Sequence, residues 1–257
     1  MSHQPYDDLF YEYQCAGSLR SARGVVPVLR GALPIDSVLD VGCGVGTWIK
    51  AHLEAGASEF LGVDGDYVDR SRLVMPADCF RAHDLTRPLD LGRRFDLVQC
   101  LEVAEHLPPS TSTELVKSLA RHGDIVLFSA APPGQGGKDH VNERTYEFWR
   151  DEFARQRYAL FDYVRRVVAG REDIEPWYRY NMLLFVHEAR VPHLHADIQG
   201  ARVPQDDPVP DPSPVAYRMR KMAVRCLPRA IVSAMVVYKH RRIVKRLRDE
   251  STRVGSA

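Results

Sequence analysis

The sequence predicts an α/β fold, in which a mostly parallel β-sheet is covered by helices on both faces. From about residue 19 to residue 188, short apolar runs typical of strands alternate with longer amphipathic runs typical of helices. Such alternation is the pattern of βαβ units. In addition, the first strand-like run ends in a cluster of glycines that leads into a helix-like run. The 257 residues are enough for one such domain with an appendage.

Each element is predicted from its own local pattern. Gly56 and Gly123 follow two helix-like runs, and glycine commonly ends a helix. Continuous apolar runs are typical of buried parallel strands, and the last two strand-like runs are expected to form an antiparallel pair. In chain order we expect a helix at 19–29, a strand at 37–41, a helix at 47–55, strands at 59–63, 79–82 and 95–101, a helix at 110–120, a strand at 124–130, a Pro/Gly-rich loop at 132–138, a helix at 144–157, and strands at 160–168 and 181–187.

The regular alternation stops after Glu188, and two further segments follow. Residues 203–214 hold five prolines and three aspartates, a composition typical of a linker. Residues 215–250 have a helical pattern that is interrupted by Pro228. We therefore divide the chain into a domain at 1–190, a linker at 191–214 and a basic helical extension at 215–257.

The charge is unevenly distributed along the chain. The formal net charge is +1, but residues 215–257 contain 12 Lys and Arg against 2 acids, so the remainder has 23 basic and 32 acidic residues. An acidic body argues against a general nucleic-acid binder. The extension is expected to be a solvated or partner-binding helix; a helix on an anionic membrane surface is the alternative, and would use Arg241, Arg242, Lys245, Arg246 and Arg248.

The composition points to a cytoplasmic protein without structural metal or disulfides. The five cysteines include no C-x-x-C pair, and no apolar run is long enough to cross a membrane. The start of the chain lacks the pattern of a signal peptide. His193 and His195 form an isolated H-x-H, which we assign to a solvated loop, and we predict no metal site.

The strongest functional signal is the glycine turn between the first strand and the second helix, Asp40-Val41-Gly42-Cys43-Gly44-Val45-Gly46. Glycines let the backbone turn sharply and approach a ligand closely. Their spacing is G-x-G-x-G, whereas dinucleotide-binding turns use G-x-G-x-x-G. The Asp40 carboxylate would repel a pyrophosphate but suits a ligand with an ammonium and a sulfonium, as in S-adenosylmethionine.

Two further acids follow the next two strands. Asp64 lies 18 positions after Gly46 and is placed to bind ribose hydroxyls, with Asp66 as the alternate. Asp84 follows the third strand and is placed to accept a hydrogen bond from an adenine amino group; a loop or cap role is its alternative.

With these motifs the chain resembles the class I S-adenosylmethionine-dependent methyltransferases. Residues 40–46, Asp64 and Asp84 match the family's first three motifs, and residues 99–107 match the fourth. The resemblance covers residues 19–188 and is closest to bacterial small-molecule enzymes of the quinone-precursor and natural-product type. It implies a Rossmann-like, doubly wound, seven-stranded sheet with an antiparallel final strand, and S-adenosyl-L-methionine as the cofactor. The predicted cofactor-binding residues are Asp40, Gly42, Cys43, Gly44, Gly46, Trp48, Asp64, Gly65, Asp84, Leu85, Leu101 and Glu102.

The resemblance also implies direct displacement at the methyl carbon, with the protein aligning the acceptor and removing its proton. Histidine is a natural base near neutral pH. We expect His140 or His106 in this role, with Glu105 as an alternative. For each of them a structural hydrogen bond is the competing interpretation. The acceptor is expected to be a small molecule methylated on oxygen, such as a secondary metabolite or a sugar.

The acceptor pocket is expected to include aromatic and polar residues from the ends of the domain. The predicted substrate-binding residues are Tyr11, Gln14, Ser18, Ser21, Trp177 and Tyr178. Alternatives remain: methylation of nitrogen or carbon on a small molecule, an RNA or protein substrate held by the basic extension, or a binding module without catalysis. A homodimer is compatible with the sequence.

Overall fold

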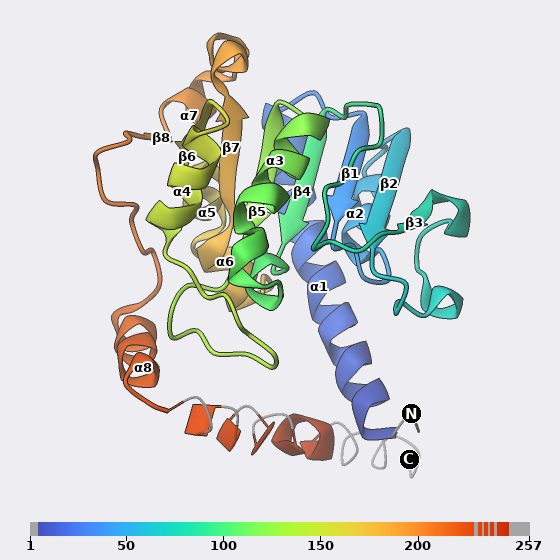
Figure 1. Cartoon of the computed structure of the whole chain (residues 1–257), viewed down its shortest axis with the longest axis vertical. Coiled ribbons are helices and arrows are strands. Elements are labelled where there is room, and N and C mark those ends of the chain that lie inside the picture. The colour runs from blue at the N-terminus through green and yellow to red at the C-terminus, as the bar shows by residue number, and fades with distance from the viewer. Residues whose placement is uncertain (1–4, 229–230, 233, 236, 239–240, 247–257) are drawn as a thin grey trace.

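The computed structural model describes residues 5–228, 231–232, 234–235, 237–238 and 241–246, with the backbone alone for residues 5–10. Within these residues, eight strands form one sheet in the order β3-β2-β1-β4-β5-β7-β6-β8 (Figure 1). The strands are β1 (Ser37–Val41), β2 (Glu59–Asp64), β3 (Phe80–Ala82), β4 (Leu97–Leu101), β5 (Ile125–Ser129), β6 (Tyr158–Phe161), β7 (Leu183–His187) and β8 (Arg202–Val203).

The sheet is mostly parallel, as the alternation predicts. Strands β1 to β5 pair in parallel, whereas β7 is antiparallel to both β5 and β6. The order reverses at β1, whose neighbours are β2 and β4. Open sheets of this kind bind ligands beyond the carboxyl ends of the strands at this switch point.

The helices pack on both faces of the sheet. The α-helices are α1 (Pro5–Ala32), α2 (Thr47–Glu54), α3 (Ser112–His122), α4 (Tyr146–Ala154), α5 (Tyr163–Val168), α6 (Pro176–Asn181), α7 (Ala196–Gln199) and α8 (Val215–Arg225). Five 3₁₀ turns lie in the described connections: η1 (Arg70–Arg72), η2 (Ala77–Cys79), η3 (Ala104–His106), η4 (Pro109–Thr111) and η5 (Glu188–His193).

The core has one layer on each face of the sheet. Successive strand residues alternate between them, because side chains in a strand point to opposite faces. Val38 and Leu97 join the layer under α1, α2 and α5, whereas Leu39 and Val98 join the layer under α3 and α4. The second layer is rich in aromatic rings, including the stacked pair Phe153–Phe185 with centroids 3.9 Å apart. Both faces are therefore buried, which explains the continuous apolar strands.

Two local predictions are wrong. The strand expected at 160–168 is split, since β6 ends at Phe161 and residues 163–168 form α5. The valines there favour a strand by propensity, but the buried Arg165 is anchored by Asp162 at 2.6 Å, one helical turn back. Tertiary packing thus overrides the local preference. The predicted seven strands become eight because Arg202 and Val203, which lie inside the predicted linker at 191–214, pair with β6.

The C-terminal extension begins with the predicted helix, α8. Its Lys221 is 6% exposed and lies 2.5 Å from Asp211, which ties the helix to the proline-rich segment. Figure 1 shows α8 and the described parts that follow it along one end of the sheet, the end from which α1 extends. Arg248 and the rest of 247–257 lie outside the described residues. None of the described helices is long and apolar enough to span a membrane.

Candidate active site

The glycine turn joins β1 to α2 and adopts backbone angles that favour glycine. Gly42, Gly44 and Gly46 have φ values of 84°, 54° and 87°, in the left-handed region that other residues rarely adopt. Space is restricted as well: a Cβ on Gly42 would lie 2.2 Å from Cγ2 of Val103, and one on Gly46 would lie 2.6 Å from Met75. The turn therefore depends on glycine at both ends.

Asp64 ends β2 beside this turn, and its carboxylate is almost fully buried at 5% exposure. It accepts hydrogen bonds from the backbone N–H groups of Gly44 and Gly65, each at 2.7 Å, and from the Tyr67 hydroxyl at 2.6 Å. Desolvation of its hydroxyl beside the Asp64 carboxylate, which accepts its hydrogen bond, raises the pKa of Tyr67, so its phenol stays protonated as a donor although the residue as a whole is exposed. Sequence reasoning missed Tyr67; an aromatic residue three positions after the strand-end acid was the available signal.

A cavity of about 690 Å³ opens at the carboxyl ends of β1 to β4, within the range typical of small-molecule sites. Of the predicted cofactor residues, seven line it: Gly42, Gly44, Asp64, Gly65, Asp84, Leu85 and Glu102. Asp84 accepts hydrogen bonds from the N–H and hydroxyl of Thr86, so it also forms the loop turn that was its alternative. The lining also includes Asp66, Tyr67, Ala82, His83, Thr86, Val103, His106 and Leu107.

The other predicted cofactor residues do not line this cavity. Cys43 and Leu101 are buried in the core, and Trp48 packs edge-on against Tyr178 with centroids 5.0 Å apart. Gly46 is the residue before α2 and shapes the turn. Asp40 is 3% exposed; burial raises the pKa of its carboxyl to about 7, and the nearby Asp64 adds to the rise.

Part of the predicted acceptor pocket meets the glycine turn. The Ser18 hydroxyl lies 2.9 Å from the Thr47 hydroxyl at the start of α2 and 3.2 Å from the Tyr178 hydroxyl. Tyr11 lies closer to the start of α1, and the centroid of its ring is 4.6 Å from the guanidinium carbon of Arg72. Helix α1 thus brings Ser18 to the turn through its packing against α2.

The remaining predicted substrate residues lie elsewhere. Gln14 is exposed on α1, and Trp177 packs partly buried against the core. Ser21 is fully buried: its hydroxyl donates to the Gly17 carbonyl and accepts from the Glu175 N–H. The Ser21 hydroxyl therefore uses both its donor and its acceptor function within the protein, and we do not propose a ligand contact for it.

Glu102 follows β4 in a left-handed conformation with φ of 56°. Its carboxylate accepts hydrogen bonds from the Asn181 amide at 3.2 Å and the Gln135 amide at 3.1 Å, and these two amides bond each other at 2.8 Å. Strained residues persist where the surrounding structure holds them, often at functional sites. Sequence reasoning missed Gln135 and Asn181, which reach Glu102 only through the sheet order.

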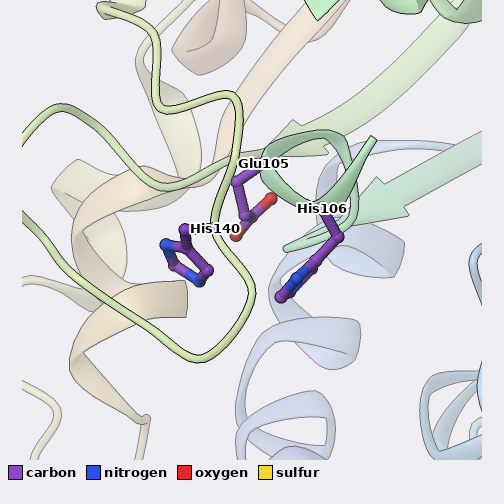
Figure 2. A group of neighbouring side chains, drawn as sticks. All are labelled: Glu105, His106 and His140. Atoms are coloured by element: carbon purple, nitrogen blue, oxygen red, sulfur yellow. The ribbon is translucent and has the colours of Figure 1, made fainter. Parts of the chain in front are cut away.

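The three predicted catalytic residues come together beside the cavity (Figure 2). Glu105 and His106 lie in η3 after β4, and His140 lies in the loop after β5, with the two imidazole centroids 4.9 Å apart. Partial burial and the neighbouring His140 lower the pKa of His106, so its imidazole is neutral near pH 7. Burial and the adjacent Glu102 carboxyl raise the pKa of Glu105. The site therefore combines a neutral imidazole with a carboxyl group that resists ionisation.

Helix α8 covers part of the loop that carries His140. A Cβ on Gly134 would lie 2.1 Å from the Lys221 carbonyl oxygen, and Arg220 donates to the Gln135 carbonyl at 3.3 Å. The Tyr217 and Tyr180 rings lie 5.6 Å apart. The start of the basic extension is thus a structural part of the site's surroundings.

A doubly wound sheet with a glycine turn after β1 and an acid after β2, both facing one cavity, defines a class I S-adenosylmethionine-dependent methyltransferase. The chain belongs to the methyltransferase-domain family, whose model matches residues 18–171. Its cofactor is S-adenosylmethionine, and the left-handed glycines and the buried Asp64 carboxylate at the cavity fit this group.

Three solved structures share the fold. DesVI from Streptomyces venezuelae has a TM-score of 0.55 at 15% identity, covering 73% of this chain and 99% of that one. The sugar N-methyltransferase KedS8 from Streptoalloteichus has a TM-score of 0.54 at 20% identity, covering 73% and 94%. The amino pentose methyltransferase CalS10 from Micromonospora echinaspora, solved with S-adenosylmethionine, has a TM-score of 0.50 at 19% identity, covering 73% and 98%. Comparison with curated protein sequences gives no match.

Proposed function

We propose that this methyltransferase acts on an oxygen of a small-molecule acceptor, with the Glu105–His106–His140 cluster receiving the acceptor's proton. The observation that carries the proposal is the position of His106, which lines the cofactor cavity and lies beside His140. A hydroxyl is a poor nucleophile until its proton is removed, so an adjacent proton acceptor favours oxygen as the methylated atom.

The protein's own side chains would bind and orient the cofactor. When bound, the cofactor supplies an activated methyl group on a sulfonium. Asp64 would hold the ribose hydroxyls in place of Tyr67, and Asp84 and Leu85 would border the adenine. Glu102, fixed by Asn181 and Gln135, would orient the end of the cofactor nearest the acceptor. Such alignment of reacting atoms is a large part of catalysis of this kind.

The acceptor class we favour is a sugar or a similar polar secondary metabolite, which would place the enzyme in natural-product biosynthesis. KedS8 and CalS10, which share the fold, are sugar-modifying enzymes by name. Both names point to amino sugars, so methylation of nitrogen is the second candidate. An amine also has to be unprotonated to react, and the same cluster would serve it.

The test is methyl transfer from labelled S-adenosylmethionine to a panel of hydroxylated and amino sugar nucleotides, with the methylated atom identified by NMR. We expect an O-methylated product, and a rate lowered about 10²- to 10⁴-fold in His106→Ala, the range of general acid–base catalysis. His83→Ala is the matched control, since His83 lines the same cavity outside the cluster. An N-methylated product, or equal losses in both variants, would contradict the proposal.

A further inference from the structure

Three potential metal ligands from two distant segments converge at one point. One ligand atom each of Glu105, His106 and His140 lies within 4.8 Å of the other two. Figure 2 shows the Glu105 carboxylate between the two imidazole rings, with η3 on one side and the loop after β5 on the other. A carboxylate and two imidazoles are a frequent ligand set for divalent transition metals.

One oxygen of the buried Glu105 carboxyl group has no hydrogen-bond donor among the described residues. Its side chain is 0% exposed; Oε1 accepts a hydrogen bond from the Ala131 N–H at 3.3 Å, but Oε2 faces no donor among the described residues. The neighbouring carboxyl of Glu102 adds negative charge rather than compensating it. A buried unpaired carboxylate oxygen is costly, and a bound cation would remove that cost.

The His140 imidazole is oriented through one nitrogen, which leaves its other nitrogen available. His140 Nδ1 lies 2.9 Å from Glu143, whose carboxylate also accepts the N–H groups of Gly134 and Gly136 at 2.8 and 2.9 Å. Metal-binding histidines characteristically use their second nitrogen in this way.

The backbone joins the two segments directly. The N–H groups of Val141 and Asn142 both donate to the Glu105 carbonyl, at 2.9 and 3.0 Å. Asp139, immediately before His140, has a φ of 61°. The loop is thus held in a strained conformation that places His140 opposite Glu105, as expected for a built site rather than a chance approach.

We propose that Glu105, His106 and His140 bind one divalent first-row transition-metal ion, with coordination positions left open for an acceptor oxygen. The two nitrogen ligands favour ions such as Zn²⁺, Mn²⁺, Fe²⁺ or Co²⁺ over Mg²⁺, which prefers oxygen. The sequence predicts no metal site, so this inference depends on the tertiary structure, which brings the three residues together.

The consequence for catalysis rests on the proposed function, whereas metal binding itself does not. His106 lines the cofactor cavity, so an ion on this cluster would lie beside the reacting groups. A hydroxyl bound to a divalent ion loses its proton more readily. The ion would then replace the histidine base of the proposed function by lowering the pKa of the acceptor hydroxyl; the proton would pass to solvent water, and both imidazoles would act as ligands.

The direct test is titration of the chelator-treated full-length protein with Co²⁺, followed by its visible absorption and by calorimetry. We expect one equivalent to bind. Glu105→Gln and His140→Ala should each weaken binding by more than about 100-fold, and Glu143→Gln by about 10- to 100-fold, since even outer-shell partners contribute that much. The His193→Ala/His195→Ala variant removes the exposed H-x-H outside the cluster and should bind Co²⁺ as the parent does.

Three other outcomes would overturn the proposed metal site. Absence of Co²⁺ binding, or binding unchanged in both Glu105→Gln and His140→Ala, would exclude the site; loss in the His193/His195 variant would place the ion on that motif instead. Titration with S-adenosylhomocysteine shows that each variant retains the fold, and His140→Ala, on a partly exposed loop residue, serves if Glu105→Gln does not fold. Metal binding without methyl transfer would contradict the proposed function alone; transfer that is insensitive to chelation would contradict the metal's role alone.

Discussion

The backbone N–H of Gly44 donates a hydrogen bond of 2.7 Å to the carboxylate of Asp64, twenty residues further along the chain. The bond joins the glycine turn after β1 to the strand-end acid after β2, so the two strongest sequence motifs form one structural unit. The Asp64 carboxylate also accepts hydrogen bonds from the Gly65 N–H and the Tyr67 hydroxyl. Its loss should therefore affect cofactor binding more than the loss of a neighbouring acid.

Asp64→Ala should weaken binding of S-adenosylhomocysteine by roughly 10- to 100-fold, because hydrogen bonds to charged groups contribute roughly 1.5–3 kcal/mol. The measurement is calorimetric titration. Asp66→Ala is the matched control, since Asp66 lines the same cavity and was the alternate candidate. A larger loss in Asp66→Ala would reassign the ribose-binding acid.

Gly42→Ala should lower the free energy of unfolding more than Gly92→Ala. Both glycines have a positive φ, 84° and 64°. A Cβ on Gly92 meets nothing within 4 Å, whereas one on Gly42 meets Val103 at 2.2 Å. The left-handed conformation alone costs about 1–2 kcal/mol, and the excess for Gly42 measures the steric conflict. Equal values in urea unfolding would show that the turn relaxes around the methyl group.

Asp40→Asn should make the ligand-free protein increasingly stable relative to the parent as the pH rises. The folded-state pKa of Asp40, raised by burial to about 7, exceeds the ordinary value of 3.8. Between these values the unfolded chain releases the proton more readily, so the parent loses stability with rising pH. The slope is at most about 1.4 kcal/mol per pH unit. Urea unfolding at pH 5 and pH 8 measures it; a constant difference between the two proteins would refute the assignment.

Replacing Arg241, Arg242 and Lys245 by serine should leave methyl transfer to a small acceptor unchanged within about twofold. These residues lie beyond α8, so their loss spares the contacts between α8 and the active-site loop. A large loss would favour an anionic macromolecular substrate held by the extension. Deleting residues 204–257 would not separate these hypotheses, because it would also remove the support that α8 gives to Gly134 and Gln135.

By itself, the sequence determined the features that depend on neighbours along the chain. The glycine turn and Asp64 could be placed because strand ends and tight turns follow from local patterns, and the carboxyl ends of parallel strands meet at one edge. The helix at 163–168 was missed for the opposite reason, since its conformation is decided by packing around Arg165.

Only the tertiary structure decided how distant segments meet. His140 reaches Glu105 and His106 because β4 and β5 are adjacent and parallel, which sets two loops side by side although 34 residues separate the histidines. Contacts between distant segments also place α8 on the same loop. They likewise form the hydrogen-bond network of Glu102, Gln135 and Asn181. Side-chain convergence is a property of strand order and packing, which the pattern of any one segment does not contain.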